Sequence, residues 1–311
     1  MRIQQLRLLL TIAETGSLRA SAQALALTQP ALTKSLRLLE DELGAPLVVR
    51  TPHGARLAPA GEILAARAAA ALRELDRARE EVAAWSGGTG ARVTVGLSPV
   101  AAALLAPGAV ARLAARWPQV QVRLIDTLYP RAFALVRSGE VDFAIGPVPG
   151  ERIDRDLALR RMFDSRAVIV VRRGHPLARA RRLAALVDAR WVLTGPAGGP
   201  GDPAALGFEA LGLGAPRPWL ACDSFSTVLA MVGGLDVVCV MPQRYFDRHG
   251  AGLDLVRLPI ADPLPDSTIH AASRADAPLT LAAQRLLDAF AEEAKGLDAA
   301  SPGARRRATP R

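Results

Sequence analysis

The chain has 311 residues, of which 50% are hydrophobic and 22% are charged. A prior of roughly 150 residues per domain predicts about two domains, and this composition excludes a disordered, collagen-like or disulfide-scaffold protein. The net charge is +9, and positive charge is densest in residues 1–61 and in the tail 301–311. This distribution favours a polyanionic partner for those ends, and the alternative is charge that only aids solubility.

Cysteine and hydropathy patterns narrow the class further. Cys222 and Cys239 lack Cys-x-x-Cys spacing and the histidines lack metal-ligand spacing, so we expect no metal and no cofactor. The uncharged stretch 93–111 has the length of a membrane helix, but glycines and prolines interrupt it and favour a strand, a turn and a buried helix. The N-terminal apolar run is too short for a signal peptide. We therefore expect a cytoplasmic protein with no membrane partner.

Three helices and a hairpin are predicted at the N-terminus. Apolar residues at helical spacing predict a helix over 4–15 and, after a Gly-Ser break, a second over 18–26. Thr28 is a natural N-cap for a third helix, which Gly44 ends. Residues 47–58 fit a small hairpin with cations at its tip. This order is typical of a winged helix-turn-helix, which we place at residues 1–60 as a DNA-binding domain.

One face of the third helix suits a nucleic acid. Gln29, Thr33 and Arg37 recur at four-residue steps, with Lys34 beside them. Acidic residues at 40–42 oppose the helix dipole and would repel phosphate, so the beginning of this helix is expected to face a polyanion. The alternative is a solvated polar face on a bundle helix.

Residues 61–86 predict one long linker helix with a regular apolar stripe. The stripe alternates steps of four and three residues, as in a heptad seam, and comprises Leu64, Ala68, Ala71, Leu75, Ala78, Val82 and Trp85. We expect this seam to mediate dimerisation, in a homodimer or a homotetramer, and packing on its own domain is the alternative. The glycine-rich residues 87–90 then mark a hinge.

Strand-like and helical segments alternate through residues 91–300. Strands are predicted at 93–96, 120–125, 141–146, 168–172, 191–193, 219–222, 237–241 and 269–273, and helices at 109–117, 131–138, 203–213 and 226–233. The alternation predicts parallel sheets covered by helices, and a Gly/Pro-rich break near 195–203 favours two sheets. Residues 296–311 are expected to form a disordered basic tail.

Ligands of open α/β sheets bind beyond the carboxyl ends of the strands. Polar or glycine residues at such ends are the candidate ligand-binding residues Ser98, Thr127, Thr194, Gly195, Gly198, Gly199 and Ser226. The glycine-rich loop 194–202 can direct several backbone amides at one anion, whereas helix capping and turn formation are the alternatives. This loop lacks the Gly-Lys-Ser/Thr ending of a nucleotide site, and no nucleophile elbow or metal centre points to an enzyme.

The N-terminal motifs resemble those of a known family. Ser17-Leu18, the run Thr-Gln-Pro-Ala-Leu-Thr at 28–33, Leu39-Glu40, Leu43-Gly44 and Pro59-Ala60-Gly61 are similar to the DNA-binding signature of LysR-type transcriptional regulators. The residues that this resemblance implies at the DNA are Gln29, Pro30, Thr33, Lys34 and Arg37, with Arg50 and His53 near phosphates.

The resemblance also implies the rest of the architecture. The fold class would be α/β with an N-terminal all-α-type winged helix-turn-helix, a linker helix that dimerises, and a two-lobed effector-binding domain at 91–295 like a periplasmic binding protein. Its first lobe would comprise about 91–163 and 269–295, and its second about 164–268. Promoter or operator DNA and a small, anionic effector between the lobes would be the partners, as in regulators of aromatic sulfonate or sugar catabolism.

Two other functions stay open at this point. The chain could be a small-molecule binding protein, or an α/β enzyme, with N-terminal helices that serve only for oligomerisation. A binding protein would keep every activity after substitution of Gln29 or Arg37. An enzyme would need a catalytic constellation that the sequence does not reveal.

Overall fold

The computed structural model describes residues 1–52, 54–85, 91–148, 155–195, 197–199, 202–222 and 224–299. Contacts divide the chain into two compact units, Met1–Gly88 with Ser138–Glu140, and Thr89–Arg137 with Val141–Arg311.

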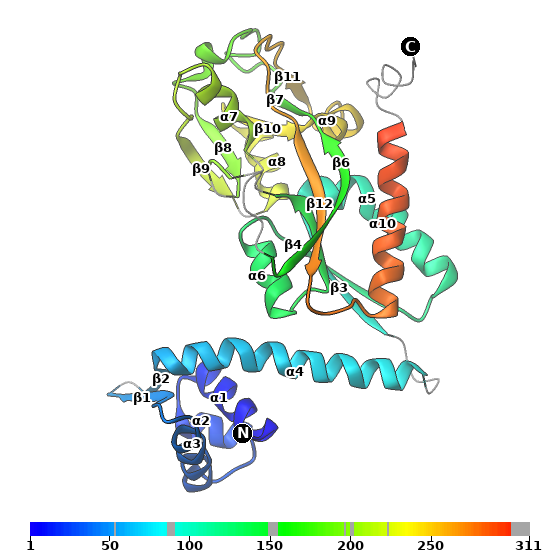
Figure 1. The fold of residues 1–311 in the computed structure, drawn as a ribbon. Helices are drawn as coiled ribbons and strands as arrows, with labels where there is room; N and C mark the ends of the chain where they lie inside the picture. The colour runs from blue at the N-terminus through cyan, green and yellow to red at the C-terminus, as the bar shows by residue number, and fades with distance from the viewer. Residues whose placement is uncertain are drawn as a thin grey trace. The chain divides into compact units, whose positions relative to one another are not determined.

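The first unit contains the predicted helices and hairpin. Its elements are α1 (Ile3–Thr15), α2 (Leu18–Ala24), α3 (Gln29–Leu43), β1 (Val48–Thr51), β2 (Gly54–Leu57) and α4 (Pro59–Trp85) (Figure 1). The Thr28 hydroxyl caps α3 by accepting from the backbone N–H of Ala31, and Gly44 ends it in the left-handed region at φ 66°. The antiparallel pair β1–β2 forms the wing. The expected winged helix-turn-helix order is confirmed.

A leucine-rich core holds the three helices to the wing. Leu9 and Ile12 of α1, Leu32 and Leu39 of α3, and Leu47 before β1 belong to the same buried cluster. They lie at helical spacing on α1 and α3, which gives each helix one apolar face.

Two contacts with the backbone at the start of the wing hold the end of α3 and the beginning of α4 in place. Glu40 Oε1 accepts from the backbone N–H of Leu47 at 2.8 Å and of Val48 at 3.2 Å. A Cβ at Gly61 would lie 2.0 Å from the Leu47 carbonyl oxygen, so only glycine lets α4 begin this close to the wing. Glu40 therefore has a structural role that its place in an acidic run did not indicate.

The predicted seam on α4 is divided between two environments. Ala68 is buried with Leu6 of α1 and Leu72, and Leu64 packs against that cluster. The later seam positions, Ala71, Leu75, Ala78 and Val82, are exposed. The seam is therefore not one continuous exposed stripe, because its first two positions pack on the chain's own domain. The side chain of Trp85 lies outside the described residues.

The second unit contains two five-stranded sheets with the strand orders β4-β3-β5-β12-β6 and β11-β7-β10-β8-β9. The first sheet comprises β3 (Arg92–Leu97), β4 (Gln121–Asp126), β5 (Phe143–Pro147), β6 (Leu157–Ser165) and β12 (Ser267–Arg274). The second comprises β7 (Ala167–Arg172), β8 (Trp191–Thr194), β9 (Pro218–Cys222), β10 (Val238–Pro242) and β11 (Leu255–Arg257). The helices are α5 (Pro99–Arg116), α6 (Arg131–Ser138), the short 3₁₀ helix Leu183–Leu186, α7 (Pro203–Ala210), α8 (Phe225–Gly234), α9 (Gln243–His249) and α10 (Leu281–Ala299).

The structure corrects several expectations for this unit. The sheets are mixed rather than parallel, because β12 runs antiparallel to β5 and β6, and β7 antiparallel to β10 and β11. Strands β6 and β11 and helices α9 and α10 were not predicted. Helix α10 continues to Ala299, into the segment expected as a tail, and residues 300–311 lie outside the described residues.

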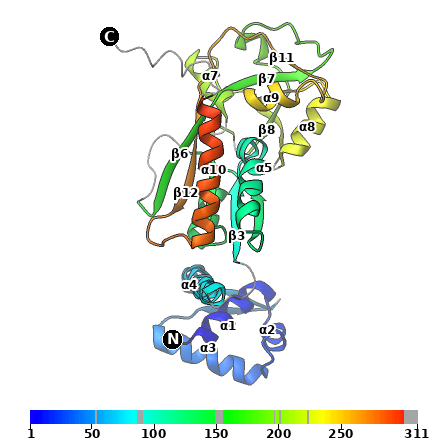
Figure 2. The same ribbon diagram turned by 90° about the vertical axis from the view of Figure 1, so that its right-hand side faces the viewer.

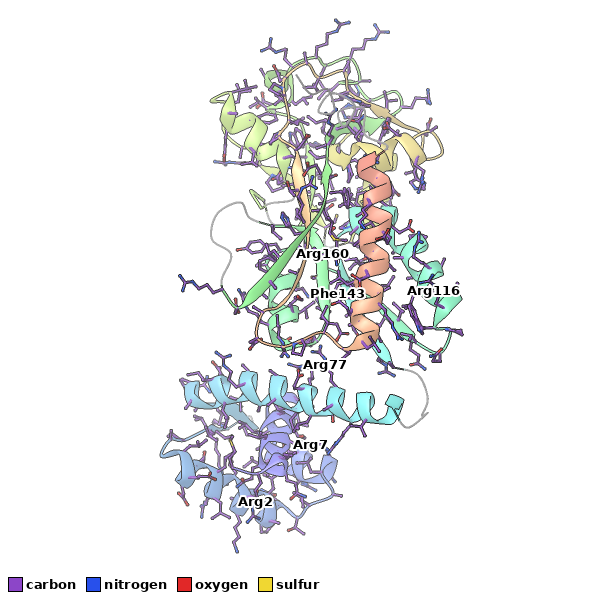
Figure 3. The ribbon with its side chains drawn as sticks, turned by 45° about the vertical axis from the view of Figure 1, so that its right-hand side comes forward. Arg2, Arg7, Arg77, Arg116, Phe143 and Arg160 are labelled. Atoms are coloured by element: carbon purple, nitrogen blue, oxygen red, sulfur yellow. The ribbon has the colours of Figure 1, made fainter. Side chains whose placement is uncertain are left out.

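Helices α5 and α10 lie side by side on one face of the first sheet (Figure 2). Phe143 of β5, labelled in Figure 3, packs edge-to-face on Phe290 of α10 at 6.1 Å between ring centroids. Among the described helices, α5 alone has the length and apolar composition of a membrane span. Its Ala101, Leu105 and Ala109 are buried in this core, as a strand, turn and buried helix predict.

The chain crosses between the two sheets at two places. It leaves the first sheet after Ser165 of β6 and returns at Ser267 of β12. These crossings lie close to the expected lobe boundaries at 163/164 and 268/269. We call the first sheet with α5, α6 and α10 the first lobe, and the second sheet with α7, α8 and α9 the second lobe.

Candidate functional site

Most of the predicted DNA-facing residues surround one open hollow on the first unit. The hollow measures about 610 Å³ and is lined by Gln29, Pro30, Thr33, Lys34, Arg37, Leu38, Asp41 and Arg50. Leu38 and Asp41, which were not predicted, share the exposed side of α3. His53 lies outside the described residues. The fold thus brings the beginning of α3 next to the first strand of the wing.

The charge of this hollow is mostly positive. Lys34, Arg37 and Arg50 are exposed, and no carboxylate among the described residues forms an ion pair with them. Asp41 lies three turns along α3 at the far border, while the amino end of the helix adds the positive end of its dipole. Exposed cations with a glutamine at a helix start can bond base edges and phosphates.

A second candidate site is a small cavity where the two lobes of the second unit face each other. It measures about 90 Å³, and its lining includes Ser98, Pro99, Leu128, Pro147, Ser165, Arg166, Thr194, Phe225, Pro242, Ser267 and Ile269. Ser98 and Thr194 were predicted, whereas Arg166, Phe225 and Ser267 were missed. Ligand pockets commonly measure roughly 300–1,000 Å³, so a ligand here must be very small or the lobes must separate.

The predicted hydroxyl residues have different environments. Ser98 is 1% exposed, and its Oγ accepts from the Ala101 backbone N–H at 3.4 Å as the N-cap of α5. Thr127 is 8% exposed, and its Oγ1 is one of the buried polar atoms with no hydrogen-bond partner in the described structure. Ser226 is exposed at the start of α8 and shares a 2.7 Å hydrogen bond with Ser224. Of these, only Ser98 lines the cavity.

The glycine-rich loop does not present all its amides to a ligand. Gly195 and Gly198 adopt the left-handed φ values that favour glycine, 80° and 69°. The Gly198 N–H donates to Asp202 Oδ2 at 3.1 Å, and Asp202 Oδ1 caps α7 by accepting from Ala205. The Asp202 carboxylate therefore already accepts from the Gly198 amide, one of those expected to bind an anion. Capping, the alternative interpretation, explains this part of the loop, and Gly199 beside it does not line the cavity.

Arg166 supplies the cation of the cavity. It lies at the crossing between the lobes, and its Nε is 3.7 Å from Asp266 Oδ2, with both side chains more than half exposed. At that distance and exposure the pair is weak, so the guanidinium can turn to another anion. No group of three or more histidine, cysteine or acidic residues in the described part of the chain is placed to hold a metal ion.

Comparison with known proteins identifies both units. Residues 3–62 match the bacterial regulatory helix-turn-helix protein of the lysR family, and residues 86–295 match the LysR substrate binding domain. The chain is 29% identical to the HTH-type transcriptional regulator GalR of Pseudomonas putida, over 84% of this chain and 66% of GalR, or about two thirds of that relative. It is 31% identical to the SDS degradation transcriptional activation protein of a Pseudomonas species, over 97% and 98% of the two chains.

Solved structures share the fold. Full-length CbnR complexed with its target DNA superposes with a TM-score of 0.67 at 19% identity, covering 95% of this chain and 99% of CbnR. Full-length OxyR from Pseudomonas aeruginosa superposes with a TM-score of 0.62 at 24% identity, covering 95% of each chain.

Proposed function

The chain belongs to the LysR family of bacterial transcriptional regulators, and from that premise we propose that α3 and the wing bind promoter DNA under the control of a small, anionic effector. The family makes this chain a DNA-binding regulator with an effector-binding domain, not an enzyme. The residues that read DNA, the identity of the effector and the assembly are the subject of the proposal.

One observation carries the DNA interface. Gln29, Lys34, Arg37 and Arg50 line a single hollow, and its three cations form no ion pairs within the described residues. Gln29 suits an adenine edge, and Arg37 and Lys34 suit guanine or phosphate. Arg50, from the wing, would bond the neighbouring DNA backbone, and we propose the same role for His53.

Charge and size support a small anion as the effector. Arg166 lines the cavity, and the beginning of α5 at Ser98 and Pro99 turns the positive end of a helix dipole towards it. Because the cavity is small, effector binding would shift the chain towards conformers with a wider cleft. Effectors of aromatic sulfonate or sugar catabolism are the class that we propose to test first.

Exposure of Ala71, Leu75, Ala78 and Val82 supports pairing of α4 with a second chain. The regulator would then be a homodimer or homotetramer that binds two half-sites. A regulator acting on promoter DNA would work in the cytoplasm.

The test is selection of bound fragments from sheared genomic DNA by the purified protein, at two salt concentrations. We expect enrichment of a site with two similar half-sites, loss of that enrichment with Gln29→Ala, and retention with Gln121→Ala, an exposed glutamine on β4. Arg37→Ala should weaken binding of the enriched site by about 1–3 kcal/mol if it bonds a base. Salt-sensitive binding without enrichment would mean that the basic residues bind DNA without sequence preference. The chain would then be better interpreted as a small-molecule binding protein.

A further inference from the structure

A leucine of the first lobe lies on a glycine of the second lobe. Leu128 is found between β4 and α6, and Gly195 follows β8 (Figure 1). A Cβ at Gly195 would lie 2.9 Å from Leu128 Cδ1, and the next two atoms around it, at 3.8 and 3.9 Å, also belong to Leu128. The Leu128 side chain therefore packs directly on the backbone of Gly195, and we call this packing the interlobe contact.

The backbone around Leu128 fixes this side chain to the first lobe. On one side, the N–H of Thr127 donates to the carbonyl of Leu97 on β3 at 2.9 Å. On the other side, the carbonyl of Leu128 accepts from the N–H of Ala132 at 2.8 Å, at the start of α6. The next residue, Tyr129, packs against the apolar cluster of α6. Leu128 therefore moves with the first lobe as a whole.

On the second lobe, Gly195 leaves the space that Leu128 occupies. Its φ of 80° lies in the left-handed region that favours glycine, and its N–H donates to the carbonyl of Cys222 on β9 at 3.4 Å. An alanine here would bring its methyl carbon to 2.9 Å from Leu128, closer than nonbonded carbon atoms pack. The observed arrangement of the lobes therefore needs a residue without a side chain at this position.

Two other links between the lobes are of a different kind. The chain itself crosses after Ser165 and before Ser267. In addition, Arg244 of α9 donates a hydrogen bond to the carbonyl of Leu297 on α10 at 2.5 Å. The interlobe contact joins an apolar side chain to a backbone, so breaking it exposes apolar surface but leaves no hydrogen bond unmade. It is therefore a contact that can open and close again.

Leu128 is also a wall of the cavity between the lobes. It lines the cavity together with Ser165, Arg166 and Ser267 from the two crossings and Phe225 of α8. Because the cavity measures about 90 Å³, a molecule of more than a few atoms fits only if the lobes separate. A bend at the crossings, where Arg166 alone lies between β6 and β7, would separate them and would break the interlobe contact.

We propose that the interlobe contact holds the cleft narrow, and that a ligand of the cleft must displace Leu128 from Gly195 before it binds. Regarding this ligand as the effector rests on the proposed function, whereas closure of the cleft by Leu128 does not. A chain that is mostly closed binds such a ligand with an affinity reduced by the fraction of open molecules. The interlobe contact therefore sets the ligand concentration at which the lobes separate.

Two substitutions break the interlobe contact in opposite ways. Leu128→Ala removes the side chain that lies on Gly195, whereas Gly195→Ala adds a methyl group that keeps Leu128 away. Gly198→Ala is the matched control, because Gly198 has a similar φ of 69° in the same loop and no neighbouring atom within 4 Å of its Cβ position. The control therefore introduces the same backbone strain without contacting the first lobe.

Pulsed electron paramagnetic resonance of the full-length protein measures the separation of the lobes. Arg131→Cys on α6 and Glu209→Cys on α7 supply one exposed thiol on each lobe for spin labels, and the two native cysteines are buried. Dilution with excess unlabelled protein suppresses distances between two chains of an assembly. Because Arg131 closely follows Leu128 in the chain, we expect longer distances in Leu128→Ala and Gly195→Ala. The distances in Gly198→Ala should equal those of the wild type.

Binding of anilinonaphthalene sulfonate, an apolar anion too large for the closed cavity, gives a second readout. We expect its fluorescence to saturate at a dye concentration about tenfold lower in Leu128→Ala than in the wild type, the order expected when the apolar contact of one leucine is lost. Gly195→Ala should change the affinity in the same direction, and Gly198→Ala should not change it. Adding Arg166→Gln to Gly195→Ala should weaken the binding again, because this guanidinium lines the cavity.

Unchanged distances in both Leu128→Ala and Gly195→Ala would overturn the proposal. A shorter distance in Leu128→Ala would overturn it too, because Leu128 would then hold the lobes apart. An equal change in Gly198→Ala would assign the effect to backbone strain in the loop, with the same consequence. Longer distances together with failed enrichment of genomic DNA would remove the proposed function and leave the interlobe contact, and enrichment with unchanged distances would do the opposite.

Discussion

The bond between the end of α3 and the wing gives a sharp test of how the DNA-binding unit is held together. Glu40 Oε1 accepts from the backbone N–H groups of Leu47 and Val48 at 2.8 and 3.2 Å. Leu47 is buried, so its amide has no access to solvent that could replace the carboxylate. In Glu40→Ala both amides lose their acceptor while the buried core of the unit keeps its side chains.

The expected size follows from these two bonds. A hydrogen bond to a charged group contributes about 1.5–3 kcal/mol, and because one oxygen serves both amides we take about 2 kcal/mol for the pair. That corresponds to a fall of about thirtyfold in the protection of the two amides against hydrogen exchange, since about 1.4 kcal/mol is tenfold. Hydrogen exchange resolved at Leu47 and Val48 measures it directly. Glu40→Gln, which keeps a neutral acceptor, should give an intermediate loss.

Asp41→Asn is the matched control, because it removes the same charge from an exposed neighbour on α3. It should leave the protection of Leu47 and Val48 unchanged. Equal losses in Glu40→Ala and Asp41→Asn would refute the reasoning, since the net charge at the end of the helix, and not the two hydrogen bonds, would then stabilise the wing.

Three further predictions concern other parts of the chain. Leu75→Asp, at an exposed seam position, should give folded monomers in analytical sedimentation, and a persisting dimer would contradict pairing through α4. Burial raises the pKa of Cys239 to about 12, so iodoacetamide at pH 8 should alkylate this thiol only after unfolding, and rapid labelling of the native protein would contradict its burial. Burial lowers the pKa of His175, and the nearby negative charge of Asp236 offsets only part of this effect. As the pH falls below the ordinary value of 6.5, the unfolded chain therefore binds a proton at this histidine before the folded chain does. The free energy of unfolding should therefore fall as the pH drops from 7.5 to 5.5, and His175→Gln should reduce that slope; an unchanged slope would show that other groups cause it.

Local signals predicted the parts of the fold that local energetics decide. Thr28 caps the beginning of α3 and Gly44 ends it, as these residue types predict. Runs rich in β-branched residues, such as 168–172, form strands. Strand β6 was missed because Arg160 and Arg161 interrupt its apolar alternation in the middle. Its pairing with β12 includes a register shift between Ile269 and His270, which no local pattern reveals.

In the candidate sites too, residues related by local spacing could be predicted, whereas residues brought together by tertiary contacts could not. The predicted DNA-facing residues that the structure describes lie within one helix and one adjoining strand, so helical spacing alone brought Gln29, Thr33 and Arg37 to one face. By contrast, β5 and β12 are far apart in sequence, and only their register places Gly146 opposite His270. Likewise, nothing in the glycine-rich loop indicated that Asp202 would accept from the Gly198 amide.

The two faces of α4 have a consequence for how an assembly of this regulator would hold DNA. Ala68 and Leu72 fix α4 to Leu6 of α1, and the core of the unit fixes α1 to α3. The direction of α3 is therefore set by the direction of α4 within each chain. If the exposed positions from Ala71 to Val82 pair with a second chain, the angle between the two α4 helices sets the separation of the two recognition helices. A seam substitution that keeps the dimer but changes its crossing angle, such as Ala78→Leu, should then change the preferred half-site spacing without changing the half-site sequence. An altered half-site sequence would place the seam in base recognition and contradict this division between spacing and reading.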